Sequence, residues 1–175
     1  MLGLIAVTSL AAPAAPTTAT TPTTPAGPPP GLSGFDVPAA TFAYLARAAT
    51  SLQEAITAPD VGMRYATAHV AALRATAALL AARARPTAPV RGRARAQRNA
   101  WVLLAEVAPE LAEWAAFFSA GAAKRAAAEA GSRRAVTERE ADDLVRDADR
   151  FLGIVEESLG LTRHVPIPAT LVQVG

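Results

Sequence analysis

Cysteine is absent from the sequence, and only two of its 175 residues are histidine. The first absence excludes disulfides and thiolate metal sites, and two histidines alone cannot supply a zinc site. Aromatic side chains make up only 5% of the chain, and β-branched residues are sparse outside its two ends. Alanine, the strongest helix former, is abundant. The composition therefore predicts an all-α protein, and we expect no metal and no cofactor.

An excess of charge of either sign is also lacking. The chain has 17 basic and 15 acidic residues, and its pI of about 9.7 reflects arginine, because Lys124 is the only lysine. A balance of this kind does not by itself predict nucleic-acid binding. Beyond the N-terminal region, no segment has the charge-free apolar run of about 20 residues that a membrane-spanning helix needs. We therefore predict a single domain with no membrane partner.

The first 35 residues carry no charged side chain. Their start, Leu2–Ala12, is apolar enough to suggest a signal peptide, but the positively charged segment that precedes such a core is missing. The prolines and threonines that follow can neither continue a helix nor build a core. We expect residues 1–36 to form a disordered leader of a cytoplasmic protein. A start codon assigned too early and a cleaved export signal are the alternatives.

Two stretches in the first half of the chain repeat apolar residues at helical spacing. Between Pro38 and Ala58 the larger ones are Phe42, Leu45, Leu52 and Ile56. Asp60 follows as the expected N-cap of a second helix that extends to about Ala84. Its expected buried stripe consists of Ala66, Val70, Leu73, Ala77 and Leu80. The two helices should form an antiparallel hairpin.

Both tryptophans lie in the next periodic segment, which begins at Asn99 and ends near Gly131. Pro109 either starts a new helix there or kinks a continuous one. Trp114 and Phe117 should widen the core stripe of this segment, which comprises Trp101, Leu104, Ala108, Leu111, Ala115 and Phe118. We therefore expect this part of the chain to anchor the core.

The last expected helix begins with a capping box at Thr137–Glu140 and ends at Gly160. Its apolar face is formed by Leu144, Val145, Ala148, Phe151, Leu152, Val155 and Leu159. The opposite face should be solvated; it carries Asp142, Asp143, Arg146, Asp147, Asp149, Arg150 and Glu157. We expect residues 37–160 to form the bundle. Residues 161–175 should form a loose tail, in which Leu171 and Val172 could dock.

Arg64 and His69 are the first candidates for chemistry, because a histidine beside an arginine can perform acid–base chemistry on a phosphodiester without metal. A separation of five residues turns the side chains about 140° apart on a regular helix, so a pair from one chain would not readily converge on one phosphate. The structural alternative is a packed, hydrogen-bonded His69 and an Arg64 that contacts an acidic neighbour.

A second candidate is a basic segment that provides positive charge for phosphates. It lies in the expected loop 85–98, and its nucleic-acid-binding candidates are Arg91, Arg93, Arg95 and Arg98. Aromatic side chains for base stacking are absent there, so a solvated loop is the favoured alternative. The carboxylates Glu106, Glu110 and Glu113 lie on one helix side but lack the Glu-x-x-His elements of a di-metal bundle.

Several strings of this sequence resemble the actinobacterial branch of the HEPN superfamily. The longer strings are RYATAHVAALR at Arg64–Arg74, WVLL at Trp101–Leu104 and APELAEWAAFF at Ala108–Phe118. Two shorter ones near the end of the bundle are ADDL at Ala141–Leu144 and FL at Phe151–Leu152. The similarity spans about residues 38–160. It implies an antiparallel bundle of four or five helices, commonly dimeric, that works beside RNA or nucleotides in toxin–antitoxin and defence systems.

Many HEPN domains are metal-independent ribonucleases in which an Arg-x(4–6)-His motif from each of two copies meets across the dimer. Arg64 and His69 match that spacing, but they lie in the second expected helix, and Tyr65 stands where a polar residue usually follows the arginine. Arg98-Asn99 looks more like the usual start of the motif, yet no histidine follows it over the next six residues.

Three functions stay open at this point. We favour a homodimeric, non-catalytic HEPN-like module that binds RNA, a nucleotide or a cognate protein. The first alternative is an RNA endonuclease in which His69 is the general acid or base and Arg64 stabilises the phosphate across a dimer. The second is a purely structural helical protein. Enclosure of His69 in the core would argue against the endonuclease.

Overall fold

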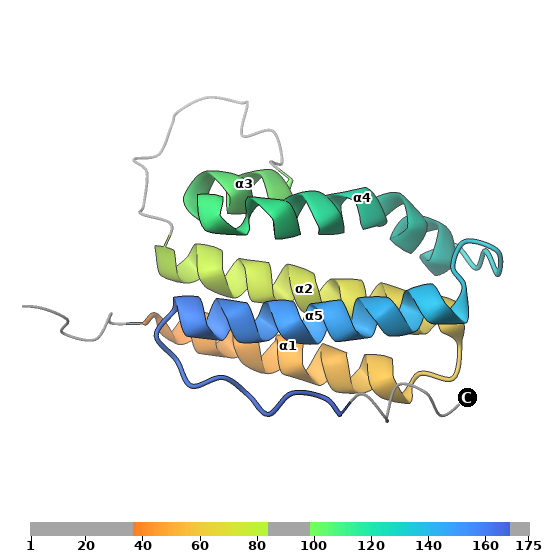
Figure 1. The fold of residues 1–175 in the computed structure, drawn as a ribbon, viewed down its shortest axis with the longest axis horizontal. Coiled ribbons are helices and arrows are strands. Elements are labelled where there is room, and N and C mark those ends of the chain that lie inside the picture. Colours follow the sequence, from red (N-terminus) through yellow and green to blue (C-terminus); the bar gives the residue numbers. More distant parts are fainter. Residues whose placement is uncertain (1–36, 84–98, 169–175) are drawn as a thin grey trace, which may run out of the picture. The chain divides into compact units, whose positions relative to one another are not determined.

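The computed structural model describes residues 37–83 and 99–168, which form five α-helices and one short 3₁₀ helix (Figure 1). In chain order these are α1 (Ala39–Thr57), α2 (Val61–Arg83), α3 (Ala100–Val107), η1 (Pro109–Leu111), α4 (Ala112–Glu129) and α5 (Glu138–Ser158). The described ranges contain no strand, so the predicted all-α fold of four or five helices is confirmed. None of these helices is both long and apolar enough to cross a bilayer. The predicted leader, residues 1–36, lies outside the described residues.

The helix ends follow the capping signals of the sequence. The side-chain oxygen of Asp60 accepts a hydrogen bond from the backbone N–H of Met63 at 2.8 Å, as expected of an N-cap. Thr137 and Glu140 form the predicted capping box, in which each side chain accepts from the backbone N–H of the other. Gly160 closes the same helix with a φ of 70°, a conformation that glycine adopts without strain.

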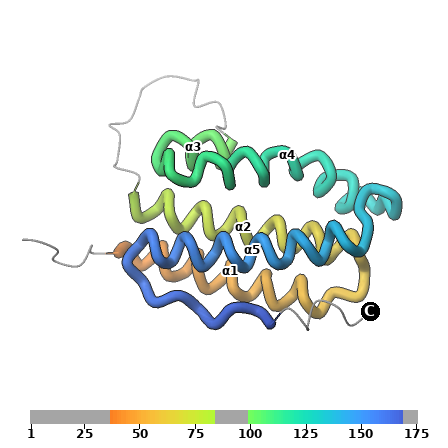
Figure 2. The backbone as a smooth tube through the Cα atoms, in the orientation of Figure 1, coloured from red at the N-terminus to blue at the C-terminus, as the bar shows by residue number. Residues whose placement is uncertain are grey.

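α2 is the central helix of the bundle. It forms the predicted hairpin with α1, and Figure 2 shows that the two run antiparallel. α5 packs against both helices of this hairpin, while α3 and α4 contact α2 from another side (Figure 1). Because α4 and α5 run antiparallel (Figure 2), the end of α4 meets the start of α5 at the end of the bundle where α2 begins.

The buried stripe predicted for α2 is wrong in most positions. Ala66 is buried as expected, but Val70, Leu73, Ala77 and Leu80 are only partly buried. The residues that α2 buries lie on several sides of the helix: Tyr65, Ala66, Ala68, His69, Ala71, Ala72, Ala75, Thr76, Ala78 and Leu79. Since α2 has neighbouring helices on several sides, its small alanines make many of the contacts. The positions of Val70, Leu73 and Leu80 therefore do not indicate which face of α2 is buried.

The stripe predicted for the tryptophan segment is confirmed, since all six of its residues are buried. The rings of Trp101 and Phe118 stack with centroids 5.2 Å apart, and the Phe118 ring lies 5.2 Å from that of Phe151. Pro109 begins a 3₁₀ turn between α3 and α4, because it cannot supply the backbone N–H that a continuous helix requires. It therefore separates two helices instead of kinking one.

Two aromatic residues assigned to the core stripes lie at the surface instead. Phe42 in α1 is 50% exposed, and Phe117 in α4 is 46% exposed. Phe117 directly precedes the fully buried Phe118. Consecutive residues on a helix point about 100° apart, so both rings cannot face the same core.

The C-terminal end departs from the sequence-based expectation. The apolar face of α5 is buried as predicted, but Asp149, assigned to the solvated face, is only 7% exposed. It accepts a hydrogen bond from the imidazole of His164 at 2.8 Å. The expected loose tail is therefore held against α5 as far as Ile167, because its polar groups find acceptors there. Leu171 and Val172, which we expected could dock on the bundle, lie outside the described ranges.

Candidate functional site

Arg64 projects from the first turn of α2 and binds two neighbouring elements. Its guanidinium donates to the carboxylate of Asp142 in α5 at 2.6 Å. It also donates to the backbone carbonyl of Ala58, in the turn before α2, at 3.3 and 3.4 Å. The Arg64 and Asp142 side chains are only 17% and 18% exposed. The guanidinium thus connects α2, α5 and the α1–α2 turn.

His69, five residues further along α2, is 1% exposed. Its Nε2 lies 2.9 Å from the carbonyl oxygen of Phe118, which only accepts, so Nε2 carries the proton. The rings of Trp101 and Phe118 stand edge-on to the imidazole, with centroids 5.5 and 5.9 Å away. Burial lowers the pKa of His69 below its usual value, so the ring is neutral in this environment.

The two candidate catalytic residues therefore face different parts of the bundle. Arg64 reaches α5, whereas His69 points to α4 and is enclosed by the aromatic core. The remaining ring nitrogen of His69, Nδ1, is buried and has no hydrogen-bond partner among the described residues. One protomer does not bring the pair together on a shared, open surface.

The other sequence candidates give no site within the described ranges. Arg91, Arg93, Arg95 and Arg98 lie outside those ranges, so their role in binding nucleic acid stays a prediction. Of the three helix carboxylates, Glu110 forms an ion pair with Arg83, which lowers its pKa. Over residues 37–83 and 99–168, no three His, Asp or Glu side chains gather as metal ligands would.

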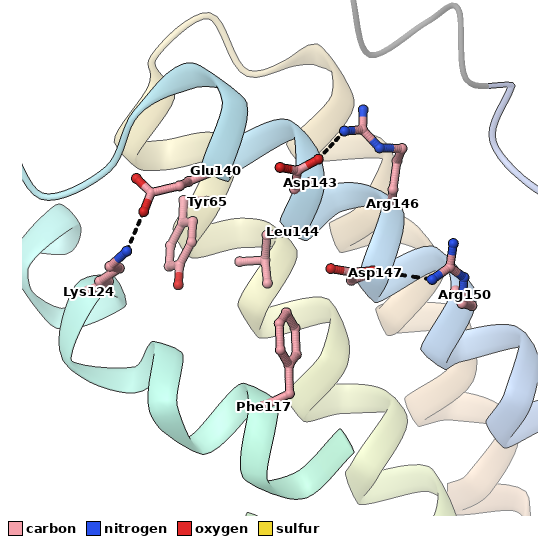
Figure 3. A pocket seen from close by; sticks show the side chains of 9 residues that line it. All are labelled: Tyr65, Phe117, Lys124, Glu140, Asp143, Leu144, Arg146, Asp147 and Arg150. Carbon is pink, nitrogen blue, oxygen red and sulfur yellow. Dashed lines mark hydrogen bonds and ion pairs between the residues drawn. The ribbon is translucent and has the colours of Figure 1, made fainter. Parts of the chain in front are cut away.

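A pocket that the sequence did not reveal lies between α4 and α5 (Figure 3). Tyr65 of α2, Phe117 of α4 and Leu144 of α5 give it an apolar floor, and charged residues of α4 and α5 form its walls. These charged residues are Lys124, Glu140, Asp143, Arg146, Asp147 and Arg150. No residue in its lining is a histidine or a serine, so the pocket lacks a nucleophile–base pair of the usual kind.

The charges of this pocket are paired. Lys124 binds Glu140 across the gap between the helices, Arg146 binds Asp143, and Arg150 lies 3.6 Å from Asp147 (Figure 3). Hydrogen bonds from Lys124 and from Thr137 lower the pKa of Glu140 to about 2. The pair with Glu140 also raises the pKa of Lys124. Both groups are therefore charged at neutral pH, and the wall has as many acids as bases.

Aromatic side chains complete the pocket. Tyr65 is 5% exposed, and burial raises the pKa of its phenol, so it stays neutral. Phe117 contacts the rings of Trp114 and Phe118 edge-on, which fixes its orientation while leaving about half of its surface open. The sequence contained each residue of this pocket, but only the juxtaposition of α2, α4 and α5 brings them together.

Comparison with protein families identifies the family to which the chain is similar. The family model described as SAV_6107-like HEPN matches residues 55–156, which is more than half of the chain. The match begins near the end of α1 and covers α2, α3, α4 and most of α5. It therefore includes Arg64, His69 and every residue that lines the α4–α5 pocket. Searches of curated proteins and of solved structures found no match.

Proposed function

The chain belongs to the SAV_6107-like HEPN family, and we propose that it is a non-catalytic member that binds protein, namely a second copy of itself, through α4 and α5. The observation that carries the proposal is the exposed Phe117 of α4, which lines the same pocket as the paired charges of α4 and α5. Aromatic side chains are enriched at protein–protein contacts relative to the rest of the protein surface.

The surroundings of His69 support a role without catalysis. A general acid or base must reach a substrate proton within hydrogen-bond distance. The Nε2 of His69 is already bound to a backbone carbonyl, and the whole side chain is 1% exposed. Arg64 is likewise bound, to Asp142 and Ala58. A nuclease role for either side chain would require the loss of these hydrogen bonds.

The charge balance of the pocket favours protein over RNA. An RNA-binding groove needs unpaired Arg or Lys side chains that can neutralise phosphates. Each of the three cations in the pocket lining has an acidic partner in the same lining. Binding a phosphate would therefore require loss of an ion pair and would place the phosphate beside a carboxylate.

The order of charges along α5 supports a second copy as the partner. Asp143, Arg146, Asp147 and Arg150 follow the spacing i, i+3, i+4 and i+7, which places them on one helix face. A two-fold axis beside the middle of this row would align the helices of two copies in opposite directions. Asp143 would then face the partner's Arg150, and Arg146 would face the partner's Asp147. Such an isologous contact is self-complementary.

Enzymatic activity is tested with the full chain, structured and unstructured RNA, and EDTA. We expect no cleavage above the level of the Arg64→Gln and His69→Asn variants, each checked for folding by circular dichroism. Cleavage by the wild type that both folded variants lose would contradict the non-catalytic assignment. RNA binding that disappears on combined Arg91→Ala, Arg93→Ala and Arg95→Ala substitution would contradict the choice of protein over RNA.

Self-association is tested by measuring the molar mass of the full chain with light scattering. We expect a dimer that dissociates on Phe117→Asp substitution. Phe42→Asp is the matched control, because Phe42 is exposed to a similar extent, at 50% against 46%, but lies on α1. A monomeric wild type, or equal effects of the two substitutions, would overturn the proposed dimer surface.

A further inference from the structure

The C-terminal segment Leu161–Pro168 returns along α5 after the turn at Gly160 (Figure 1). Within it, Leu161 and Ile167 are partly buried against the hydrophobic core. Arg163 lies over Gly153 of α5, where a β-carbon would collide with its guanidinium, and it also lies 3.5 Å from Glu157. A glycine in the C-terminal half of α5 thus provides the room that this segment occupies.

His164 makes the central polar contacts of the segment. Its Nδ1 lies 2.7 Å from Glu156 Oε2, and its Nε2 lies 2.8 Å from Asp149 Oδ1. The backbone N–H of His164 donates to the same Glu156 oxygen at 2.8 Å. The backbone N–H of Ile167 lies 3.4 Å from both oxygens of Asp149. The two α5 carboxylates therefore bind both the ring and the backbone of the segment.

The protonation state of the ring follows from these partners. Carboxylate oxygens at neutral pH only accept hydrogen bonds, so both ring nitrogens must carry a proton to satisfy them. A neutral imidazole has only one N–H. The lone pair of its other ring nitrogen would then face a carboxylate oxygen at under 3 Å. The Asp149 and Glu156 side chains are only 10% and 13% exposed, so solvent cannot readily replace the lost contact.

The charged groups that act on the ring are Glu156 and Asp149, both on α5. Burial by itself would lower the pKa of His164, but the hydrogen bonds to Asp149 and Glu156 and the charges of both outweigh it. The pKa is therefore raised above 6.5. The other charged side chain of the segment, Arg163, interacts with Glu157 rather than with this cluster.

From this geometry we infer that residues 161–168 are a pH-sensitive latch, closed while His164 is protonated between Asp149 and Glu156 and released when it loses that proton. Release leaves two carboxylates without their shared donor. It also uncovers the apolar surface against which Leu161 and Ile167 are packed. The latch is a feature of the fold, separate from the α4–α5 pocket.

The chain's two histidines make a direct test possible, because a proton–carbon NMR spectrum of the imidazoles contains two sets of signals. We expect His164 in the full chain to titrate above 6.5 and His69 below it. His164→Gln identifies its signal. Asp149→Asn should move the His164 titration to lower pH by removing one of its two carboxylates. A His164 titration at or below 6.5, or one unchanged by Asp149→Asn, would overturn the latch.

Release itself is measured by hydrogen exchange with mass spectrometry from about pH 6 to about pH 9, corrected for intrinsic exchange. Above about pH 6.5, His164 is deprotonated in the open state but still protonated in the closed state. The equilibrium constant between the open and closed states of the segment should therefore rise by up to about tenfold per pH unit. The rise should level off above the pKa of the closed state. We expect this loss of protection in residues 161–168 and not in α5. In His164→Gln the segment should be unprotected throughout. Protection independent of pH, or retained in that variant, would contradict the inference.

Discussion

His69 lies where α2, α3 and α4 meet, and it fills a position that a purely apolar core would give to a large hydrophobic residue. Its ring packs edge-on against two aromatic rings and donates to the buried backbone carbonyl of Phe118. The sequence offered two interpretations of this residue, catalysis and packing. Spacing alone could not decide between them, because the choice depends on α4, which is more than 40 residues away in the chain.

Replacing His69 with alanine should lower the free energy of unfolding by about 2–4 kcal/mol. The substitution leaves a cavity beside Trp101 and removes the hydrogen bond from the imidazole to the Phe118 carbonyl. Urea denaturation followed by circular dichroism measures the change. Met63→Ala on the same helix is the control, since Met63 is 59% exposed and its truncation should cost under about 0.5 kcal/mol. Equal stability of the two variants would contradict the structural role of His69.

At the scale of elements, the sequence predicted some helices better than others. α5 carries large apolar residues on one face and charges on the other, so its periodicity and its capping box identified its bounds and its buried side. α2 is rich in alanines, most of which are buried, and alanine shows little contrast between buried and exposed positions. The sequence therefore revealed the extent of α2 but not its central position.

The capping box of α5 should make stability depend on pH. Since Lys124 and Thr137 lower the pKa of Glu140 from 4.5 to about 2, its contribution is complete above about 4.5 and is lost as pH falls towards 2. Glu140→Gln should therefore lower the melting temperature at neutral pH and have little effect near pH 2. Glu138→Gln in the same turn is the control. A difference from wild type that does not change with pH would contradict this assignment.

Gly121 of α4 leaves room for the Tyr65 side chain of α2. A β-carbon at this position would lie 2.8 Å from the hydroxyl oxygen of Tyr65. Gly121→Ala gains about 1 kcal/mol of helix propensity, but we expect a net loss of about 1–2 kcal/mol, because the buried Tyr65 side chain must shift to make room. Ser119→Ala, at an exposed position of α4, should be neutral. Urea denaturation compares the two, and a stabilising Gly121→Ala would show that the contact relaxes without cost.

At the scale of the whole molecule, the residues that sequence reasoning proposed for function and those that the structure gathers are different sets. Arg64 and His69 were visible as a motif, but the bundle separates them. The α4–α5 pocket was invisible, because it combines residues of three helices that carry no common motif. From the sequence, Phe117 was interpreted as a core residue and the charged row of α5 as solvated surface. Their joint exposure on one surface is a tertiary property.

The central claim is that two copies associate through the charged row of α5, and sedimentation velocity of four charge variants tests it most directly. Asp143→Arg and Arg150→Asp should each weaken the dimer about tenfold or more, since a two-fold contact contains each altered pair twice. Arg133→Asp, at an exposed site outside the row, is the control. The double variant Asp143→Arg/Arg150→Asp should restore association by reversing both partners. A double variant as monomeric as the single variants, with helicity intact, would contradict the proposed pairing.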